Sequence, residues 1–368
     1  MSAEDFTTRL QLQLREAAER EERRTAIGRR TAGARAALAL RWAPGPLLAA
    51  AAVVALLLVG LWTLTASDPE PEPATPPGLR IVSTVPLGET LNGGAVVAFG
   101  ALWVSDSGRG EIVRVDPGTR KVTARIPVGG ETDLAASHGS LWAVRNRVTV
   151  GRESGPLLRI DPRTRRIVAR IALRTPGGDL VGGAFPLVGP RIWVIGRSGA
   201  LAVDPARNRV VRHVAISSAG YNVENALIHD RELWLTSSSG STVRYDARTG
   251  RRLGRLSWRP GPVLIPYRDR FVELGRSTVA LVAPDTGRAA WRSRVTQETH
   301  WADVVGDRVI VVGLDGTSPR ERLWEVDART GRVSRPIVLP AFGPVRILGV
   351  GEETWVLMQS GSAVVVRR

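Results

Sequence analysis

A unit of roughly forty residues that recurs through most of the chain restricts the possible folds more than any other feature. The clearest copy runs from Ala101 to Gly130 and contains three short apolar runs separated by two turn signals. Each run alternates apolar and polar residues, as a strand does when one of its faces is buried. This copy therefore predicts a three-strand meander.

The centre of each unit is an apolar strand, which usually carries an aromatic residue. The central residues are Trp103, Trp142, Trp193, Trp234, Phe271, Ile310 and Trp355. Turns containing aspartate recur with them, at Asp116, Asp161, Asp204, Asp246, Asp285 and Asp327. An aspartate in such a turn can accept hydrogen bonds from backbone amides two residues further on. A spacing of about forty residues is typical of a four-stranded blade, so the seven units predict an all-β, seven-bladed β-propeller.

The two ends of the repeat region predict how the ring closes. After Gly351 the last unit has only two strands, 354–358 and 363–368, and lacks an outer strand. The segment 79–88 precedes the first complete unit and matches the outer strand 120–129 of that unit. We therefore expect this first strand to join the last blade, which would close the ring and remove its exposed edges.

Composition excludes some chemistry and leaves the question of charge open. The chain has no cysteine, so it contains neither a disulfide nor a thiolate metal site. Its formal net charge is +16, and Lys121 is its one lysine. This excess of arginine is consistent either with a GC-rich genome or with an anionic partner.

An uncharged run over residues 43–66 predicts a single transmembrane helix. As a helix it would be roughly 36 Å long, enough to cross a hydrocarbon core of about 30 Å. Arginines from Arg23 to Arg41 precede the run and Asp68 follows it, so the positive-inside rule places the N-terminus in the cytoplasm. A cleaved signal peptide is the alternative, but its apolar core is usually shorter than this run.

The segments on either side of this run have different compositions. Residues 1–42 are polar and helix-prone, and residues 1–41 are a candidate docking helix for a cytoplasmic partner. Residues 67–78 contain five prolines, which favour an extended stalk. Residues 79–368 then form the predicted extracytoplasmic propeller.

The stretch GALWVSDSGRGEIVRVDPGTRKVTARIPVGG resembles the repeats of YVTN-type bacterial propellers. That group is similar to virginiamycin B lyase and to the extracellular propellers of some receptor-like bacterial kinases. A narrower stretch, Ala283 to Trp291, resembles the repeat of quinoprotein-type propellers. Both resemblances imply a propeller over residues 79–368, and neither implies a particular activity.

Loops between successive blades of a propeller gather on one face, around the central channel. In this chain those loops are richer in polar residues than the opposite turns, which favours a polar funnel as the ligand site. The candidate ligand-binding residues are Asn92, Asp133, Glu224, Asn225, His300 and Arg346. The alternative is that these loops are polar only because they are solvated.

The lyase resemblance implies pairs of histidine and glutamate around a divalent cation. Of the four histidines only His300 falls in a loop between blades, and no pair matches that pattern. The quinoprotein resemblance brings no recognisable cofactor ligands. We therefore expect no metal and no cofactor, and a non-enzyme is favoured.

The expected partners follow from the predicted location and charge. Arginines gather at the aspartate turns, away from the funnel, where anionic wall polymers or lipid headgroups would be suitable partners. Nucleic acid is not expected outside the cell. The sequence thus predicts a single-pass membrane protein that presents an extracytoplasmic propeller at the cell envelope as a binding, scaffold or sensor module. The alternative is an envelope lyase or hydrolase with its centre near His300 and Glu224.

Overall fold

A computed structural model describes residues 78–145, 155–175, 178–179, 185–196, 199–215, 223–237, 240–261, 263–317, 319–341 and 343–368. All of these residues belong to one compact unit, Thr75–Arg368. The predicted cytoplasmic segment, the predicted transmembrane run 43–66 and nearly all of the predicted stalk lie outside the described residues. Within the described ranges, no helix has the length and hydropathy needed to cross a membrane.

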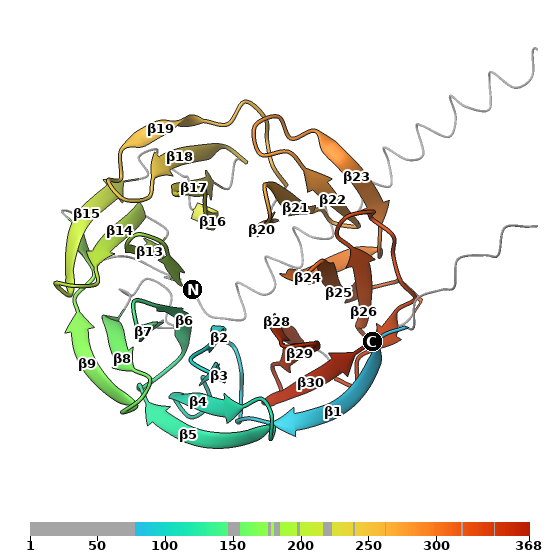
Figure 1. Cartoon of the computed structure of the whole chain (residues 1–368), viewed down its shortest axis with the longest axis horizontal. Helices are drawn as coiled ribbons and strands as arrows, with labels where there is room; N and C mark the ends of the chain where they lie inside the picture. Colours follow the sequence, from blue (N-terminus) through green and yellow to red (C-terminus); the bar gives the residue numbers. More distant parts are fainter. Residues whose placement is uncertain are drawn as a thin grey trace, which may run out of the picture. The chain divides into compact units, whose positions relative to one another are not determined.

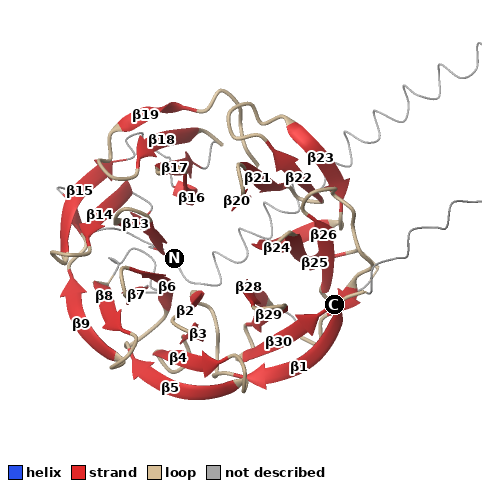
Figure 2. Cartoon of the chain, in the orientation of Figure 1, coloured by secondary structure: helices blue, strands red, loops and turns tan. Residues whose placement is uncertain are grey.

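Seven four-stranded antiparallel sheets in the described residues form a ring of blades, with the first strand of each blade nearest the centre (Figure 1; Figure 2). Blade 1 contains β2 (Ala95–Ala98), β3 (Ala101–Asp106), β4 (Glu111–Asp116) and β5 (Lys121–Pro127). Blade 2 contains β6 (Thr132–Ser137), β7 (Ser140–Arg145), β8 (Leu157–Asp161) and β9 (Arg166–Ile171). Blade 3 contains β12 (Phe185–Val188), β13 (Ile192–Gly196), β14 (Gly199–Asp204) and β15 (Arg209–Ala215). Blade 4 contains β16 (Val223–His229), β17 (Glu232–Ser237), β18 (Thr242–Asp246) and β19 (Arg252–Arg255).

The remaining blades follow the same plan. Blade 5 contains β20 (Val263–Tyr267), β21 (Arg270–Leu274), β22 (Thr278–Val282) and β23 (Ala289–Arg294). Blade 6 contains β24 (Glu298–Val305), β25 (Arg308–Leu314), β26 (Arg322–Asp327) and β27 (Ile337–Val338). Blade 7 contains β28 (Pro344–Val350), β29 (Glu353–Met358), β30 (Ser362–Arg367) and β1 (Arg80–Pro86). A separate hairpin pairs β10 (Arg174–Thr175) with β11 (Gly178–Asp179).

The first strand of the propeller closes the ring, as the sequence predicts. Strand β1 lies antiparallel to β30, so blade 7 combines the two ends of the propeller (Figure 1). The backbone N–H groups of Leu87 and Gly88, just after β1, both donate to the Gly361 carbonyl, at 2.9 and 3.0 Å. Strand β1, from the N-terminal end of the propeller, is thus the outer strand of the last blade. It pairs with the edge of β30 that would otherwise be exposed.

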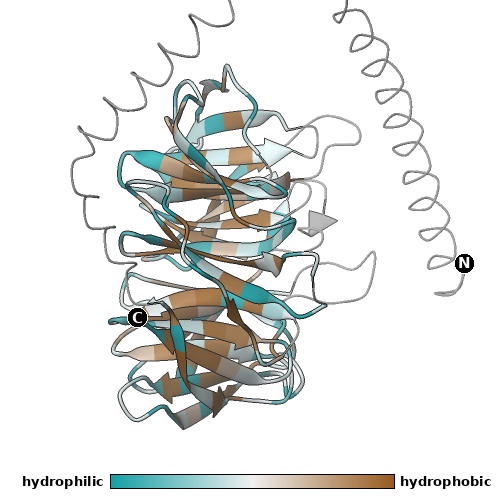
Figure 3. Ribbon diagram, turned by 90° about the vertical axis from the view of Figure 1, so that its right-hand side faces the viewer, coloured by the Kyte–Doolittle hydropathy of each residue, from teal (hydrophilic) through white to brown (hydrophobic). Residues whose placement is uncertain are grey.

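The hydrophobic core lies between neighbouring blades. The central aromatic residues of the repeat stand on the second strand of their blades, where Trp103, Trp142, Trp193, Phe271 and Trp355 are completely buried. One cluster joins apolar residues of blades 7 and 1, and another joins those of blades 2 and 3. Figure 3 shows the hydrophobic residues concentrated along the strands. The periodic aromatic residues are therefore core residues that fasten one blade to the next.

Antiparallel order divides the connections between two faces. We call the face with the connections between blades and between second and third strands the loop face. The opposite face, which carries the aspartate turns and the hairpins between first and second strands, is the turn face. In the first turn Asp116 Oδ1 accepts the backbone N–H of Thr119 at 2.7 Å, and in the second Asp161 Oδ1 accepts that of Arg163 at 2.7 Å. Asp204, Asp246 and Asp327 accept backbone N–H groups in the same way, so the predicted role is confirmed for five of the six turn aspartates.

The fifth residue of the aspartate turn has a positive φ in blades 1, 2, 3, 4 and 6. It is glycine in blades 4 and 6, and in blade 5 the equivalent glycine, Gly287, stands two residues after Asp285. In blades 1, 2 and 3 it is Arg120 (56°), Arg165 (61°) and Asn208 (51°). Two turns thus hold an arginine in a backbone region that L-residues other than asparagine rarely occupy.

Candidate functional site

The structure places the predicted funnel residues mainly on strands. Asn92 is exposed in the loop that leads into blade 1. The other five stand on first strands: Asp133 on β6, Glu224 and Asn225 on β16, His300 on β24 and Arg346 on β28. Each first strand contacts those of the neighbouring blades, so these strands form the inner ring of the propeller. The candidates are therefore distributed around that ring, and no described ligand site brings all six together.

Two of these residues occupy β-bulges. In blade 4 the pairing of β16 with β17 shifts between Val223 and Asn225, which leaves Glu224 as the extra residue. In blade 6 the pairing of β24 with β25 shifts between Thr299 and Trp301, which leaves His300 as the extra residue. A bulge turns a side chain away from the regular alternation of the strand. The side chain of Glu224 is outside what the structure describes.

His300 belongs to a bonded group at the junction of blades 6 and 7. Its Nδ1 is 2.7 Å from Oε1 of Glu321, a residue only 2% exposed that directly precedes β26. The other carboxylate oxygen, Oε2, accepts the backbone N–H of Gly343 at 2.9 Å. Gly343 lies in the connection that enters blade 7, so Glu321 ties the inner strand of one blade to the loop leading into the next.

Arg346 faces a second acidic residue on the neighbouring inner strand. Burial raises the pKa of Asp303 on β24 above its ordinary value, against the opposing effects of the Val304 N–H and the Arg346 charge. That N–H donates to Asp303 Oδ1 at 2.7 Å. The Nε of Arg346 is buried and has no hydrogen-bond partner among the residues that the structure describes. Loss of solvation therefore has the largest effect on the pKa of Asp303. Asp303 was not among the six candidate ligand-binding residues predicted from the sequence.

Replacing Asp303 with asparagine is expected to stabilise the propeller at neutral pH. A raised folded-state pKa favours the folded protein below the unfolded pKa, and this stabilisation is lost as pH rises through the folded pKa. Asp303→Asn stays neutral and keeps an acceptor for the Val304 N–H, so its melting temperature should exceed that of the wild type at pH 7–8 and match it near pH 3. Thermal unfolding across this pH range measures the difference.

Asp116→Asn is the control, because Asp116 is perturbed in the opposite direction. The Thr119 backbone N–H and hydroxyl lower the pKa of this exposed carboxyl. Ionised Asp116 thus stabilises the fold above the unfolded pKa, and its replacement should bring no gain at pH 7–8. An equal gain in both variants would show that burial of Asp303 is not its cause.

Buried polar side chains hold the loop face together. The carboxylates of Asp106, Glu273 and Glu321 each accept a backbone N–H from a connection between blades, those of Glu89, Gly261 and Gly343 respectively. Ser105 Oγ accepts the Thr132 N–H, at 3.0 Å, in the same way. These contacts were not predicted from the sequence, although for Asp106 and Glu273 an acidic residue at the end of or within an apolar second strand is a usable signal. Among the described residues no group of three His, Asp or Glu could hold a metal ion.

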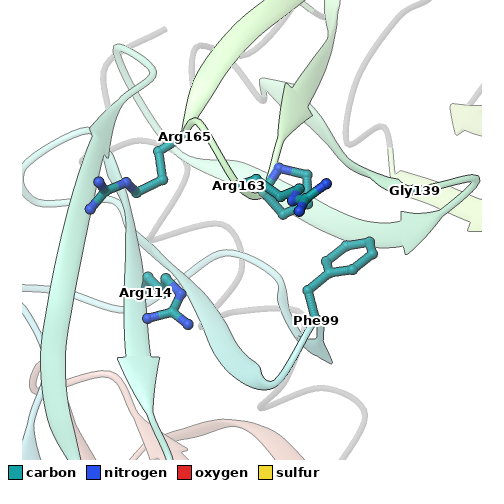
Figure 4. A pocket seen from close by; sticks show the side chains of 6 residues that line it. Phe99, Arg114, Gly139, Arg163 and Arg165 are labelled. Carbon is teal, nitrogen blue, oxygen red and sulfur yellow. The ribbon is translucent and has the colours of Figure 1, made fainter.

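A cavity of about 570 Å³ lies on the turn face, between blades 1 and 2 (Figure 4). Its lining residues are Phe99, Arg114, Gly139, Pro162, Arg163 and Arg165. They come from the first hairpins of the two blades, from β4 and from the aspartate turn of blade 2. None belongs to the predicted funnel, but the turn arginines belong to the basic surface that the sequence predicts away from it.

Comparisons with known proteins agree on the architecture. A family model described as outer membrane protein assembly factor BamB matches residues 238–368. The crystal structure of BamB from Moraxella catarrhalis is similar, with a TM-score of 0.54 and 13% identity over 79% of this chain and 98% of that one. The WD40 β-propeller domain of Doa1 is similar with a TM-score of 0.60 and 11% identity, over 79% of this chain and 97% of that one. No curated protein sequence gives a significant match.

These likenesses are too distant in sequence to transfer an activity, and the family model spans only the last part of the chain. They agree with the propeller fold that the seven antiparallel blades of the described residues form. The part of the chain that the structure describes is a seven-bladed β-propeller.

Proposed function

We propose that this chain is a single-pass membrane protein whose extracytoplasmic propeller is a binding or scaffold module at the cell envelope. The observation that carries the scaffold role is the use of the buried carboxylates on the loop face. Asp106, Glu273 and Glu321 are bonded to the backbone of the connections between blades. They hold a rigid surface in place, as a module that presents loops to a partner requires.

The envelope location has separate support. The uncharged run 43–66 is long enough to cross a bilayer, and the arginines before it favour a cytoplasmic N-terminus. The family model that matches residues 238–368 and one of the similar structures are those of an outer membrane protein assembly factor. A role in assembly or sensing at the envelope is compatible with a rigid ring on a proline-rich stalk.

Cysteine labelling in intact bacteria tests this topology, because the natural chain contains no cysteine. Ser360→Cys places a thiol in the exposed turn between β29 and β30, and Ser2→Cys places one near the N-terminus. With a membrane-impermeant maleimide, Ser360→Cys should be labelled in intact cells and Ser2→Cys only after lysis. The cysteine-free wild type is the background control. Labelling of Ser360→Cys only after lysis would disprove the external location.

A lyase or hydrolase is the second candidate, and the bonded pair of His300 and Glu321 is the observation that favours it. A carboxylate on one ring nitrogen orients an imidazole for general base chemistry at the other, and the His300 side chain is 27% exposed. Our preferred proposal expects no new fragments when the full chain is incubated with purified cell-wall polysaccharide and the products are examined by mass spectrometry. Fragments that appear with the wild type and are lost in His300→Gln would favour the enzyme instead.

A further inference from the structure

The cavity between blades 1 and 2 collects positive charge and an apolar wall. Arg114, Arg163 and Arg165 contribute guanidinium groups, and Phe99 and Pro162 contribute apolar surface (Figure 4). Phe99 is 45% exposed and has a φ of 53° in the two-residue turn between β2 and β3. An exposed phenylalanine in the left-handed region is unfavourable on two counts, so neither packing nor turn geometry accounts for it.

Arg114 has equivalents in blades 2 and 4, and both of them have polar partners that Arg114 lacks. Arg114, Arg159 and Arg244 each stand opposite the central tryptophan of their blade and lie over its ring. In blade 2, Arg159 Nε donates to Ser140 Oγ at 2.9 Å. In blade 4, Arg244 forms an ion pair with Glu232 at 3.4 Å.

Blade 1 has no polar side chain at this position. Ser140 and Glu232 both stand two residues before the tryptophan, where blade 1 has the buried Ala101. Arg114 Nη1 instead donates to Thr123 Oγ1 at 2.6 Å, within its own blade. The rest of this guanidinium has no described hydrogen-bond partner, although it contributes to the lining of the cavity.

The turn of the next blade offers no partner either. In blade 3, Asn208 Oδ1 and the Pro205 carbonyl accept Nη1 of Arg159, at 3.0 and 2.8 Å, and so join blades 2 and 3. Arg165 occupies the corresponding turn position in blade 2, so a cation stands where Arg114 would need an acceptor. Among the described residues, the bonded pair of the junction between blades 2 and 3 thus has no counterpart at the junction between blades 1 and 2.

Another junction shows how an arginine at this turn position can be neutralised. Arg120 occupies it in blade 1, and its Nη2 lies 2.5 Å from Glu353 Oε1 of blade 7. Glu353 stands two residues before Trp355, the position that Ala101 fills in blade 1. Within the described part of the chain, Arg114, Arg163 and Arg165 form no ion pair with a carboxylate. The charges of Arg114 and Arg163 help to lower the pKa values of Asp116 and Asp161, but neither carboxylate forms an ion pair with them. Among the described residues, this junction therefore lacks the bonded anion that Glu353 supplies to Arg120.

We propose that this cavity binds a phosphate monoester whose substituent is apolar or planar. A phosphate monoester carries a charge of about −1.5 to −2 at pH 7, which suits several unpaired arginines better than a single carboxylate does. The planar guanidinium forms paired hydrogen bonds with phosphate oxygens. Phe99 and Pro162 then cover the substituent, and a cavity of about 570 Å³ has the size of a small-molecule site. The ligand is either a soluble organic phosphate or the headgroup of a phospholipid, which share this chemistry.

Arg165→Asn is the test, because it copies the residue that blade 3 uses at the same turn position. Asparagine tolerates a positive φ, so the turn should fold, and its side chain gives Arg114 an acceptor. Isothermal titration of the full-length protein in detergent with phenyl phosphate should show binding that this variant weakens by about tenfold or more, the effect of losing one charge-assisted hydrogen bond. Arg231→Asn is the matched control, since Arg231 is also an exposed turn-face arginine with positive φ (64°) but does not line the cavity. It should bind as the wild type does.

Phe99→Asn tests the apolar wall separately. It creates an Asn-Gly pair, the preferred sequence for this two-residue turn, so folding should not suffer. Binding of phenyl phosphate should weaken several-fold, and binding of inorganic phosphate should stay unchanged. Short-chain phosphatidic acid, used as a monomer, distinguishes the two sources: tighter binding than phenyl phosphate indicates a headgroup, and weaker binding a soluble ligand. Absence of binding to both phosphate esters, or equal weakening by Arg165→Asn and Arg231→Asn, would overturn the proposal.

Discussion

Val85→Asp is expected to open the propeller ring and abolish cooperative folding near physiological temperature. Val85 is 5% exposed on β1 and packs into the cluster between blades 7 and 1, with Leu357 and Ala363 among its members. A buried carboxylate there has no described cation to pair with, so burying it costs several kcal/mol. Once β1 detaches, the backbone of β30 loses its outer partner. We expect a loss of at least about 4 kcal/mol in the free energy of unfolding, measured by urea titration.

Thr84→Asp is the matched control, because the neighbouring side chain of the same strand is exposed. It introduces the same charge into β1 and leaves the pairing with Val364 in place. Its effect should stay within about 0.5 kcal/mol, as is usual for surface substitutions. If both variants lost the same stability, the charge in an outer strand would be responsible and ring closure would not.

The blades could be predicted from the sequence because their signals are local. Alternation along a strand, an aromatic residue in its second strand and an aspartate in the following turn all fall within a single unit. One unit lacks the aromatic residue of the second strand, and the structure gives a physical explanation. In blade 6 the second strand carries Ile310, and the large aromatic of the core is Trp324 on the third strand, 4% exposed. Trp324 on the third strand therefore fills the core space that the aromatic residue of the second strand fills in the other blades.

The arrangement of the inner ring could not be predicted in the same way. The bulges at Glu224 and His300 add a residue to first strands and hide their alternation, so the polar residues appear to belong to loops. The partner of His300 is Glu321, in the next connection of the same blade, and Gly343 lies beyond a further turn. Such pairings depend on how the strands lie relative to one another within a blade and between blades. This arrangement cannot be predicted from the order of residues alone.

The cavity on the turn face needed the same three-dimensional alignment. The sequence predicts arginines at the aspartate turns, among them Arg163 and Arg165. It does not indicate which of these arginines have a bonded partner. Only the comparison of blades shows that Arg120 and Arg159 are bonded across their junctions and that Arg165 is not. The presence of charge could therefore be predicted, and its lack of a partner could not.

Asp106→Ala is expected to be the most damaging single substitution on the loop face. Asp106 is completely buried, and its carboxylate accepts the backbone N–H groups of Glu89, Thr90 and Arg109. Arg125 Nη1 lies 3.6 Å from the same group. Alanine would leave three backbone donors and one half-buried guanidinium without this acceptor. We expect a loss of about 3–5 kcal/mol, the usual cost of removing one partner from a buried charged group.

The backbone that this carboxylate holds in place packs tightly against it. A Cβ added to Gly88 would lie 2.3 Å from Asp106 Oδ2, so the loop entering blade 1 passes directly against the carboxylate. The alanine side chain cannot reach these backbone donors, so all of them lose their acceptor together. Asp106→Asn keeps one acceptor oxygen and nearly the same volume, so its loss should be smaller than that of alanine.

Asp116→Ala is the control for this prediction, because Asp116 also accepts a backbone N–H but does so on the exposed turn face. Water can replace the lost acceptor there, and only a small loss of stability is expected. Urea unfolding followed by tryptophan fluorescence compares the variants, since four of the central tryptophans are completely buried in the native ring. The ranking Asp106→Ala, then Asp106→Asn, then Asp116→Ala follows if the buried carboxylate holds the loop that joins the last blade to the first. A loss for Asp106→Ala no larger than that of Asp116→Ala would mean that the loop keeps its position without this carboxylate, and that closure depends on β1 alone.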